Sequence, residues 1–225
     1  MTTALIGSHG VIGQSFLAQQ PVDLEFNSNN IHTLPDYDID LLIIAAPSGN
    51  RRLINSGTEQ HEIDQANVNQ IIQTVFRTRP RATVLFSSVD CVVAPNSNYG
   101  QNRYWLERAV TRYAQAAIYR LPTLIGPLIR KNILYDIRHN QFLDQIDAGA
   151  QLQWCCLKDL SRLVAQAQPG QTQNIVSEPV LNADVLTRFR PDLAQNHRPH
   201  SACYDQLPYY YSRDEIFAEM EQYLK

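Results

Sequence analysis

The sequence predicts an α/β protein with a doubly wound, mostly parallel β-sheet, and two observations support this. Apolar runs of roughly four to eight residues alternate with longer amphipathic stretches, as expected of strand and helix units around a parallel sheet. Three evenly spaced glycines stand directly after the first apolar run. A chain of 225 residues is long enough for one well-packed core, so we expect a single domain over residues 1–225.

The expected strands follow the apolar runs in chain order. Thr3–Ile6 precedes the glycines, Leu24–Phe26 follows the first expected helix, and Leu41–Ala46 and Thr83–Ser87 are runs typical of buried strands. Later strands are expected at Ala117–Arg120, around Leu152–Cys156, and at Gln173–Val176.

Helices are expected at Ile12–Ala18, Glu62–Arg77, Tyr99–Ala114 and Ser212–Lys225. In the second of these, apolar side chains recur at helical spacing and predict a face packed on the core. The last begins with Ser212 and Glu215, whose spacing predicts a capping box. Proline becomes frequent beyond Arg120. We therefore expect residues 1–121 to hold most of the sheet, and residues 122–225 to form a small irregular lobe together with the last sheet strands.

The composition excludes several functional classes. With 44% hydrophobic residues, 18% charged residues and a net charge of -3, the chain is typical of soluble globular proteins. Its 19 basic residues are scattered and outnumbered by 22 acidic ones, so no nucleic-acid partner is expected. No stretch approaches the roughly 18 apolar residues of a membrane span. The amino terminus lacks the basic run of a secretory signal, so we expect a cytoplasmic protein.

The four cysteines, Cys91, Cys155, Cys156 and Cys203, show no paired C-x-x-C spacing. The adjacent Cys155 and Cys156 would point to opposite faces of a strand. We therefore expect reduced, structural thiols and no metal site.

The glycine turn predicts a dinucleotide site of the Rossmann type. Gly7 would permit a tight turn, Gly10 would let the backbone approach a pyrophosphate, and Gly13 would let the helix pack on the sheet. Backbone N–H groups at Val11 and Ile12, where the helix starts, favour phosphate oxygens. The turn stands between a strand and a helix, which is the context this motif requires, so NAD or NADP is the expected cofactor. A turn needed only for packing is the alternative.

The residues after the second strand bear on the choice between NAD and NADP. A carboxylate at the strand end would bind the ribose 2′-hydroxyl and favour NAD. Here Glu25 lies inside the strand, and the neutral residues Asn27 and Ser28 follow it. They could donate to a hydroxyl or to a 2′-phosphate, although no arginine stands nearby to clamp a phosphate. The choice stays open, with a slight preference for NADP.

Several further motifs follow the glycine turn in a fixed order. They are Ser87-Ser88 at a strand end, Tyr99-Gly100-x-x-Arg103-x-x-Leu106-Glu107, Tyr119-Arg120-Leu121-Pro122-x-x-x-Gly126-Pro127, and Gln153-Trp154-x-x-Leu157-x-Asp159-Leu160. In this order they resemble the extended branch of the short-chain dehydrogenase/reductase superfamily, which contains NAD(P)-dependent nucleotide-sugar epimerases and dehydratases. The resemblance spans residue 3 to about residue 180.

The resemblance implies a catalytic group of three residues. Residues four apart share a helix face, so Tyr99 and Arg103 can address the same site. In the family, the tyrosine exchanges a proton with a substrate hydroxyl or carbonyl while hydride moves to or from the nicotinamide, and Ser88 would orient the substrate oxygen. A neighbouring cation lowers the pKa of such a phenol from its usual value of about 10. For Ser87 and Ser88, a plain strand-end turn is the alternative.

Two departures from the family pattern concern this group. The family's helix carries lysine where this chain has Arg103, whose planar guanidinium is not equivalent to an ammonium group. Ser88 and Tyr99 also stand only eleven residues apart (99 − 88), whereas a longer loop is usual in the family.

The resemblance implies further contacts with cofactor and substrate. Ala45, Ala46, Pro47 and Ser48 would line the adenine and ribose side, and Leu121 and Pro122 would abut the nicotinamide. Asn67 matches a helix asparagine near the cofactor and the catalytic groups, although a plain polar helix residue is equally consistent. Asn132 is the expected substrate contact, with a helix cap as the alternative.

The sequence therefore predicts an NAD(P)-dependent oxidoreductase or epimerase that acts on a hydroxyl or carbonyl centre of a nucleotide sugar. Its alternative is a catalytically weak or silent NAD(P)-binding sensor or interaction protein, which Arg103 and the short spacing between Ser88 and Tyr99 keep open. Residues 1–121 would mainly bind the dinucleotide, and residues 122–225 would mainly face the substrate. The superfamily often dimerises through the helices corresponding to Glu62–Arg77 and Tyr99–Ala114, so a homodimer is one possible assembly.

Overall fold

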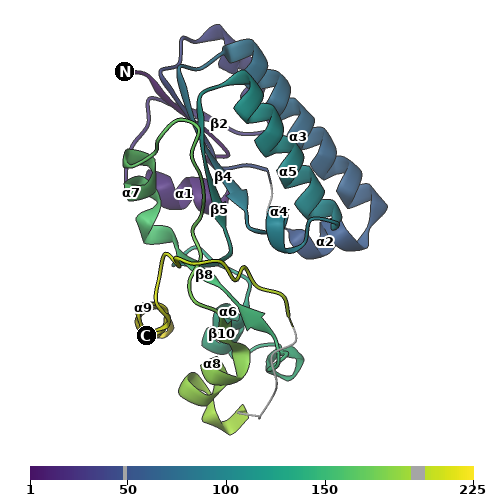
Figure 1. The fold of residues 1–225 in the computed structure, drawn as a ribbon, viewed down its shortest axis with the longest axis vertical. Coiled ribbons are helices and arrows are strands. Elements are labelled where there is room, and N and C mark those ends of the chain that lie inside the picture. Colours follow the sequence, from purple (N-terminus) through teal and green to yellow (C-terminus); the bar gives the residue numbers. More distant parts are fainter. Residues whose placement is uncertain (48–49, 194–200) are drawn as a thin grey trace. The chain divides into compact units, whose positions relative to one another are not determined.

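The chain forms two compact units in the computed structural model, which describes residues 1–47, 50–193 and 201–225 (Figure 1). The first unit comprises Met1–Arg120 and Lys158–Gln173, and the second comprises Leu121–Leu157 and Asn174–Lys225. The division after Arg120 lies next to the expected border between residues 121 and 122. The first unit also contains residues 158–173, which come from the carboxy-terminal half of the chain.

Within the described residues, six strands form the main sheet in the order β2-β1-β3-β4-β5-β9. Their bounds are β1 Thr3–Ile6, β2 Leu24–Phe26, β3 Leu41–Ile44, β4 Ala82–Ser88, β5 Ala116–Leu121 and β9 Thr172–Asn174. β1 pairs in parallel with both β2 and β3, and β3 pairs in parallel with β4. This confirms the predicted doubly wound α/β fold. Because β2 and β3 flank β1, the topological switch point lies between β1 and β3, and ligands of such sheets bind there at the carboxyl ends of the strands.

Helices cover both faces of this sheet. In the first unit they are α1 Val11–Leu17, α2 Arg51–Ser56, α3 Thr58–Thr78, α4 Asp90–Val93, α5 Asn98–Tyr113 and α7 Leu160–Ala165. Figure 1 shows α3 and α5 side by side on one face, and α1 with α7 on the other. Val68, Ile71 and Val75 of α3 recur at helical spacing and join the buried core. None of the helices in the described ranges is long and apolar enough to cross a membrane.

The second unit contains short strands and three α-helices in its described part. β6 Thr123–Ile125 pairs in parallel with β8 Trp154–Cys156, and β7 Gln151–Leu152 pairs in antiparallel fashion with β10 Val180–Leu181. The helices are α6 Ile133–His139, α8 Asn182–Phe189 and α9 Arg213–Leu224.

The strand around Leu152–Cys156 and the start of the last helix were both predicted from the sequence. The strand expected around Leu152–Cys156 is two strands, separated at Gln153, whose side-chain amide donates to the Ser177 and Tyr204 carbonyls at 2.9 and 2.8 Å. The predicted capping box is confirmed, since Ser212 and Glu215 exchange side-chain and backbone hydrogen bonds at the start of α9.

The glycine turn packs tightly against the end of β3. Gly7 has φ +93°, and a Cβ there would lie 2.6 Å from the Ala45 carbonyl oxygen. A Cβ on Gly13 would overlap the Gly7 carbonyl. The Gly7 N–H donates to the Phe26 carbonyl at 2.8 Å, which ties the turn to β2 as well. These contacts hold the carboxyl ends of β1, β2 and β3 close together.

We expect Gly7→Ala to destabilise the fold more than Gly170→Ala. Both glycines have positive φ, +93° and +81°, so alanine strains the backbone at either position by about 1–3 kcal/mol. Only Gly7 has an atom in the way of the new methyl group, which should lower the free energy of unfolding by about 1–3 kcal/mol more. Urea unfolding of the two variants measures the difference. Equal losses would show that the turn does not pack on Ala45 as described.

Candidate functional site

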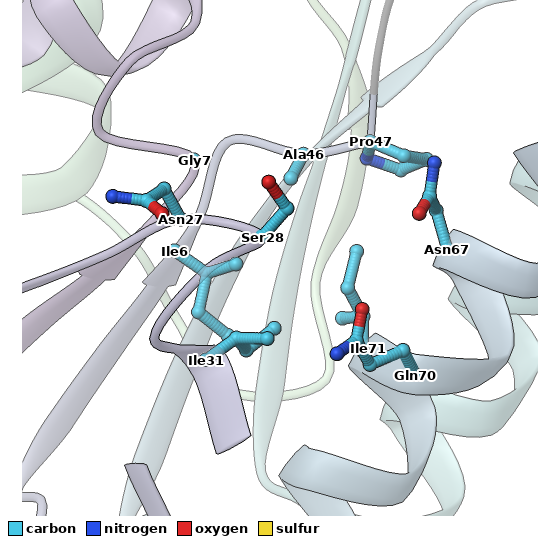
Figure 2. A pocket seen from close by; sticks show the side chains of 10 residues that line it. All are labelled: Ile6, Gly7, Asn27, Ser28, Ile31, Ala46, Pro47, Asn67, Gln70 and Ile71. Atoms are coloured by element: carbon cyan, nitrogen blue, oxygen red, sulfur yellow. The ribbon is translucent and has the colours of Figure 1, made fainter. Parts of the chain in front are cut away.

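A pocket of about 150 Å³ lies at the carboxyl ends of β1, β2 and β3, at the switch point of the sheet (Figure 2). Its lining residues are Ile6, Gly7, Asn27, Ser28, Ile31, Ala46, Pro47, Asn67, Gln70 and Ile71. Figure 2 shows Asn67, Gln70 and Ile71 of α3 facing Gly7, Asn27 and Ser28 across the pocket.

Six predicted cofactor residues come together around this pocket: Gly7, Asn27, Ser28, Ala46, Pro47 and Asn67. Gly10, Val11, Ile12 and Gly13 form the turn and the first residues of α1. Ala45 is buried with its carbonyl against Gly7, and Ser48 lies outside the described residues. That these residues bind a cofactor remains a prediction.

Four lining residues were not predicted from the sequence: Ile6, Ile31, Gln70 and Ile71. Gln70 and Ile71 follow Asn67 by three and four positions on α3, so helical spacing could have placed them on the same face. Ile31 belongs to a 3₁₀-helix, Ile31–Asp36, which no apolar period indicates.

The glycine turn and the loop after β2 present hydrogen-bond donors. Asn27 Oδ1 accepts the Asn29 N–H at 2.8 Å, so the amide NH₂ of Asn27 is the group that can donate. It lies 3.5 Å from His9 Nε2. Ser8 is 2% exposed, and its hydroxyl has no hydrogen-bond partner among the described residues. Such donors suit the hydroxyl and phosphate oxygens of a nucleotide.

Ser88 and Tyr99 come from adjoining segments of the first unit. Ser88 ends β4, and its Oγ accepts the Asp90 N–H at 3.2 Å, which is a strand-end turn. Accepting this bond does not use the hydroxyl proton of Ser88. A Cβ on Gly100 would lie 2.8 Å from the Asp90 carbonyl oxygen, so the start of α5 packs closely on this turn. The Tyr99 N–H donates to Asn55 Oδ1 at 2.9 Å.

Arg103 is buried in an ion pair that the sequence did not predict. Its two terminal nitrogens donate to both carboxylate oxygens of Asp64 on α3, at 3.0 and 2.8 Å. The guanidinium carbon also lies 4.2 Å from the centroid of the Tyr99 ring. Burial lowers the pKa of Arg103, but Tyr99 and Asp64 outweigh this and raise it. Tyr99 and Arg103 are thus in contact, with the Asp64 carboxylate beside them, and their catalytic roles remain predictions.

Asp90 is a second buried carboxyl group at this site. Its side chain lies at the start of α4, 3.4 Å from Arg51 Nε. Burial raises the pKa of Asp90, and Arg51 and Arg103 offset only part of that rise. A carboxyl group with a raised pKa beside a candidate active site is a common feature of acid–base sites. The sequence feature that could have indicated Asp90 as a site residue is its position two residues after Ser88.

A second buried ion pair, between Glu107 and Arg120, links α5 to β5. Arg120 on β5 donates to both carboxylate oxygens of Glu107 at 2.6–3.1 Å. The Cys91 thiol donates to the same carboxylate at 3.2 Å. Burial and Glu107 raise the pKa of Cys91 to about 12. This thiol is therefore protonated at neutral pH and unreactive.

No family model matches the sequence. No curated protein matches it either. A structure of UDP-glucose 4-epimerase from Thermotoga maritima with UDP-glucose matches with a TM-score of 0.67 at 10% identity, over 94% of this chain and 89% of that one. DesIV, a dTDP-glucose 4,6-dehydratase from Streptomyces venezuelae with NAD bound, matches with a TM-score of 0.68 at 16% identity, over 98% and 91%. The chain has the fold of nucleotide-sugar epimerases and dehydratases.

A third structure with the epimerase–dehydratase fold gives the same result. MoeE5 in complex with UDP-glucuronic acid and NAD matches with a TM-score of 0.70 at 13% identity, over 100% of this chain and 92% of that one. The resemblance inferred from the motifs is confirmed at the level of the fold.

Three predicted site residues belong to the second unit. Leu121 ends β5, and Pro122 separates β5 from β6. Asn132 caps α6, because its Oδ1 accepts the Tyr135 N–H at 3.0 Å while its amide donates to the Leu124 carbonyl at 3.0 Å. The helix cap that was an alternative for Asn132 is therefore present. The predicted contacts of these residues with nicotinamide or substrate remain predictions.

The outer surfaces of α3 and α5 expose large apolar side chains. They are Ile63 and Phe76 on α3, and Tyr104, Trp105 and Tyr113 on α5. Trp105 Nε1 donates to Asn69 Oδ1 at 3.3 Å, which links the two helices at this surface. A homodimer through these helices remains a prediction.

We expect Asp90→Asn to stabilise the fold near neutral pH and to have little effect in acid. Because burial raises the pKa of Asp90, its contribution to stability is present below the ordinary value of 3.8 and is lost as the pH rises through the folded-state pKa. Asparagine stays neutral and avoids that loss. Urea unfolding at about pH 7 and about pH 3 measures the effect.

Asp192→Asn provides a control of opposite sign. A hydrogen bond from Arg190 lowers the pKa of Asp192, so its contribution is present above the ordinary value and is lost as the pH falls. Asp192→Asn should therefore not stabilise the protein at neutral pH. Equal responses of the two variants would contradict the assigned cause.

Proposed function

We propose that this protein binds a nicotinamide dinucleotide and uses it to oxidise and reduce a hydroxyl or carbonyl centre of a nucleotide sugar, as an oxidoreductase or epimerase. The observation that carries the proposal is the pocket at the switch point, where Gly7, Asn27, Ala46 and Asn67 converge from separate segments. Sites for drug-sized ligands measure about 300–1,000 Å³. A pocket of about 150 Å³ therefore suits one part of a dinucleotide, and we assign it to the adenosine. Structures of this fold with UDP-glucose and with UDP-glucuronic acid support a nucleotide-sugar substrate.

NAD is the better cofactor for this pocket. The residues that line the pocket are all neutral. A 2′-phosphate would therefore find no lysine or arginine among them to pair with its charge. The amide of Asn27 and the hydroxyl of Ser28 suit a neutral ribose 2′-hydroxyl. We therefore favour NAD over the slight preference for NADP, and two structures of the same fold hold NAD.

The side chains of the first unit supply the proton transfer. When bound, the dinucleotide provides the hydride acceptor and donor. Tyr99 exchanges a proton with the substrate oxygen, and the Ser88 hydroxyl donates a hydrogen bond to the same atom. Ser88 is held for this by the Asp90 N–H. Asp90, whose pKa is raised by burial, is available as a further proton carrier.

We expect Ala46→Phe to abolish NAD binding without unfolding the protein. Ala46 lines the pocket, and a phenyl group there would occupy the space assigned to adenosine. Calorimetric titration with NAD measures the loss, which should exceed about a hundredfold in Kd. Ala165→Phe, at an exposed position of α7, is the matched control and should bind NAD like the wild type. Failure of wild-type protein to bind NAD or NADP would overturn the proposal.

We expect Tyr99→Phe to retain NAD affinity and to lose turnover of a nucleotide sugar by about a hundredfold or more, because it removes the proton-exchanging hydroxyl. A screen of UDP- and dTDP-sugars with NAD, followed by product analysis, provides the measurement. Equal turnover by Tyr99→Phe and wild type would exclude Tyr99 as the acid–base group.

One observation favours a second function. The Arg103 charge, which would otherwise be available to a cofactor, is paired with Asp64. A cofactor-binding sensor or interaction protein without turnover needs no such free cation. Tight NAD binding with no change in any nucleotide sugar tested would support this function over the first.

A further inference from the structure

We propose that Asp64 is a positioning residue of the active site, which holds the Arg103 guanidinium across the Tyr99 ring. The inference rests on the proposed function, because it gives the pair of charges a role in turnover. Asp64 stands on α3, whereas Arg103 and Tyr99 stand on α5. The contact therefore fixes the active-site side chains from a second element.

The Asp64–Arg103 ion pair, which we call the clamp, holds the guanidinium in one orientation. Arg103 Nη1 and Nη2 donate to separate oxygens of Asp64 at 3.0 and 2.8 Å, and both side chains are buried, with relative exposures of 4% and 3%. Two parallel bonds between planar groups define an orientation as well as a distance. A lysine ammonium cannot make this paired contact. The paired contact with Asp64 therefore explains why this chain has arginine at position 103, where the family that it resembles has lysine.

A third bond fixes the carboxylate itself. Asn102 donates from its amide to Asp64 Oδ2 at 2.7 Å, and the same amide lies 3.4 Å from His61 Nδ1. Asn102 and Arg103 are neighbours on α5, so Asp64 receives donors from two successive residues. A carboxylate held by three bonds has little freedom to rotate, and the guanidinium is fixed with it.

The fixed guanidinium in turn constrains Tyr99. It lies 4.2 Å from the ring centroid, well inside the roughly 6 Å range of a cation–π contact. Tyr99 is buried, and its backbone N–H is held by Asn55. The ring is therefore held at its face and at its backbone, which sets the direction of its hydroxyl. A displacement of about 1 Å at a reacting group can lower a rate about a hundredfold.

The competing explanation is that Asp64 only ties α3 to α5. A matched control exists on α5, because Glu107 forms a buried two-oxygen pair with Arg120 and stands eight residues (107 − 99), more than two helical turns, from Tyr99. If only helix stability matters, breaking either pair should have the same effect on turnover.

The test compares Asp64→Asn, Asp64→Glu and Glu107→Gln in the full-length protein, with NAD and the nucleotide sugar found in the screen. We expect Asp64→Asn to lower kcat by roughly tenfold to a hundredfold with KM and the Kd of NAD unchanged. Asp64→Glu should recover part of the loss, and Glu107→Gln should stay within about twofold of wild type at a temperature where it is folded. Equal losses in Asp64→Asn and Glu107→Gln, or an unchanged or higher kcat in Asp64→Asn, would overturn the proposal.

Two further measurements decide the matter if a variant misfolds or the wild type is inactive. Asn102→Ala removes one bond to Asp64 but keeps the ion pair, and we expect a smaller loss of kcat. Side-chain nitrogen NMR reports the clamp without turnover, because hindered rotation gives the two Nη atoms of Arg103 separate signals. A wild type with no turnover would refute the proposed function. Separate signals that merge in Asp64→Asn would still support the clamp, and merged signals in the wild type would overturn it.

Discussion

The close approach of the glycine turn to the end of β3 is the constraint on which the candidate site depends. A Cβ on Gly7 would clash with the Ala45 carbonyl, and a Cβ on Gly13 would clash with the Gly7 carbonyl. Because both positions lack a side chain, the backbone of the turn can lie against two strands at once. The loop after β2, with Asn27 and Ser28, is thereby brought beside Ala46, and a pocket forms between them.

Helix α3 connects this pocket to the candidate catalytic residues. Asn67 and Ile71 face the pocket, and Asp64, one turn earlier, holds Arg103. Spacings of three and four residues keep all of these side chains on the side of α3 that faces the protein. A shift of α3 along its axis would therefore change cofactor binding and the position of Arg103 together.

The sequence predicted the local features well, because each depends on neighbours in the chain. β1 and β2 have the predicted bounds, and six pocket residues were expected, since most of them directly follow strands in a fold whose ligands bind at strand ends. The Asp64–Arg103 pair was missed because it joins residues 39 positions apart, and it depends on how two helices align. The short helix α8 was missed because its apolar period is too brief to distinguish from a loop, and α6 was indicated only by the alternative of a helix cap at Asn132.

The first unit is assembled from two stretches of the chain, and residues 158–173 bring α7 and most of β9 to it. Proteins are synthesised from the amino terminus, so β5 is the edge of the nascent sheet until β9 has been made. An unpaired edge strand can recruit other chains. Every residue that lines the pocket lies within the first 71 positions. On the ribosome the residues that line the pocket are thus synthesised long before β9, the strand that covers the edge of the same sheet.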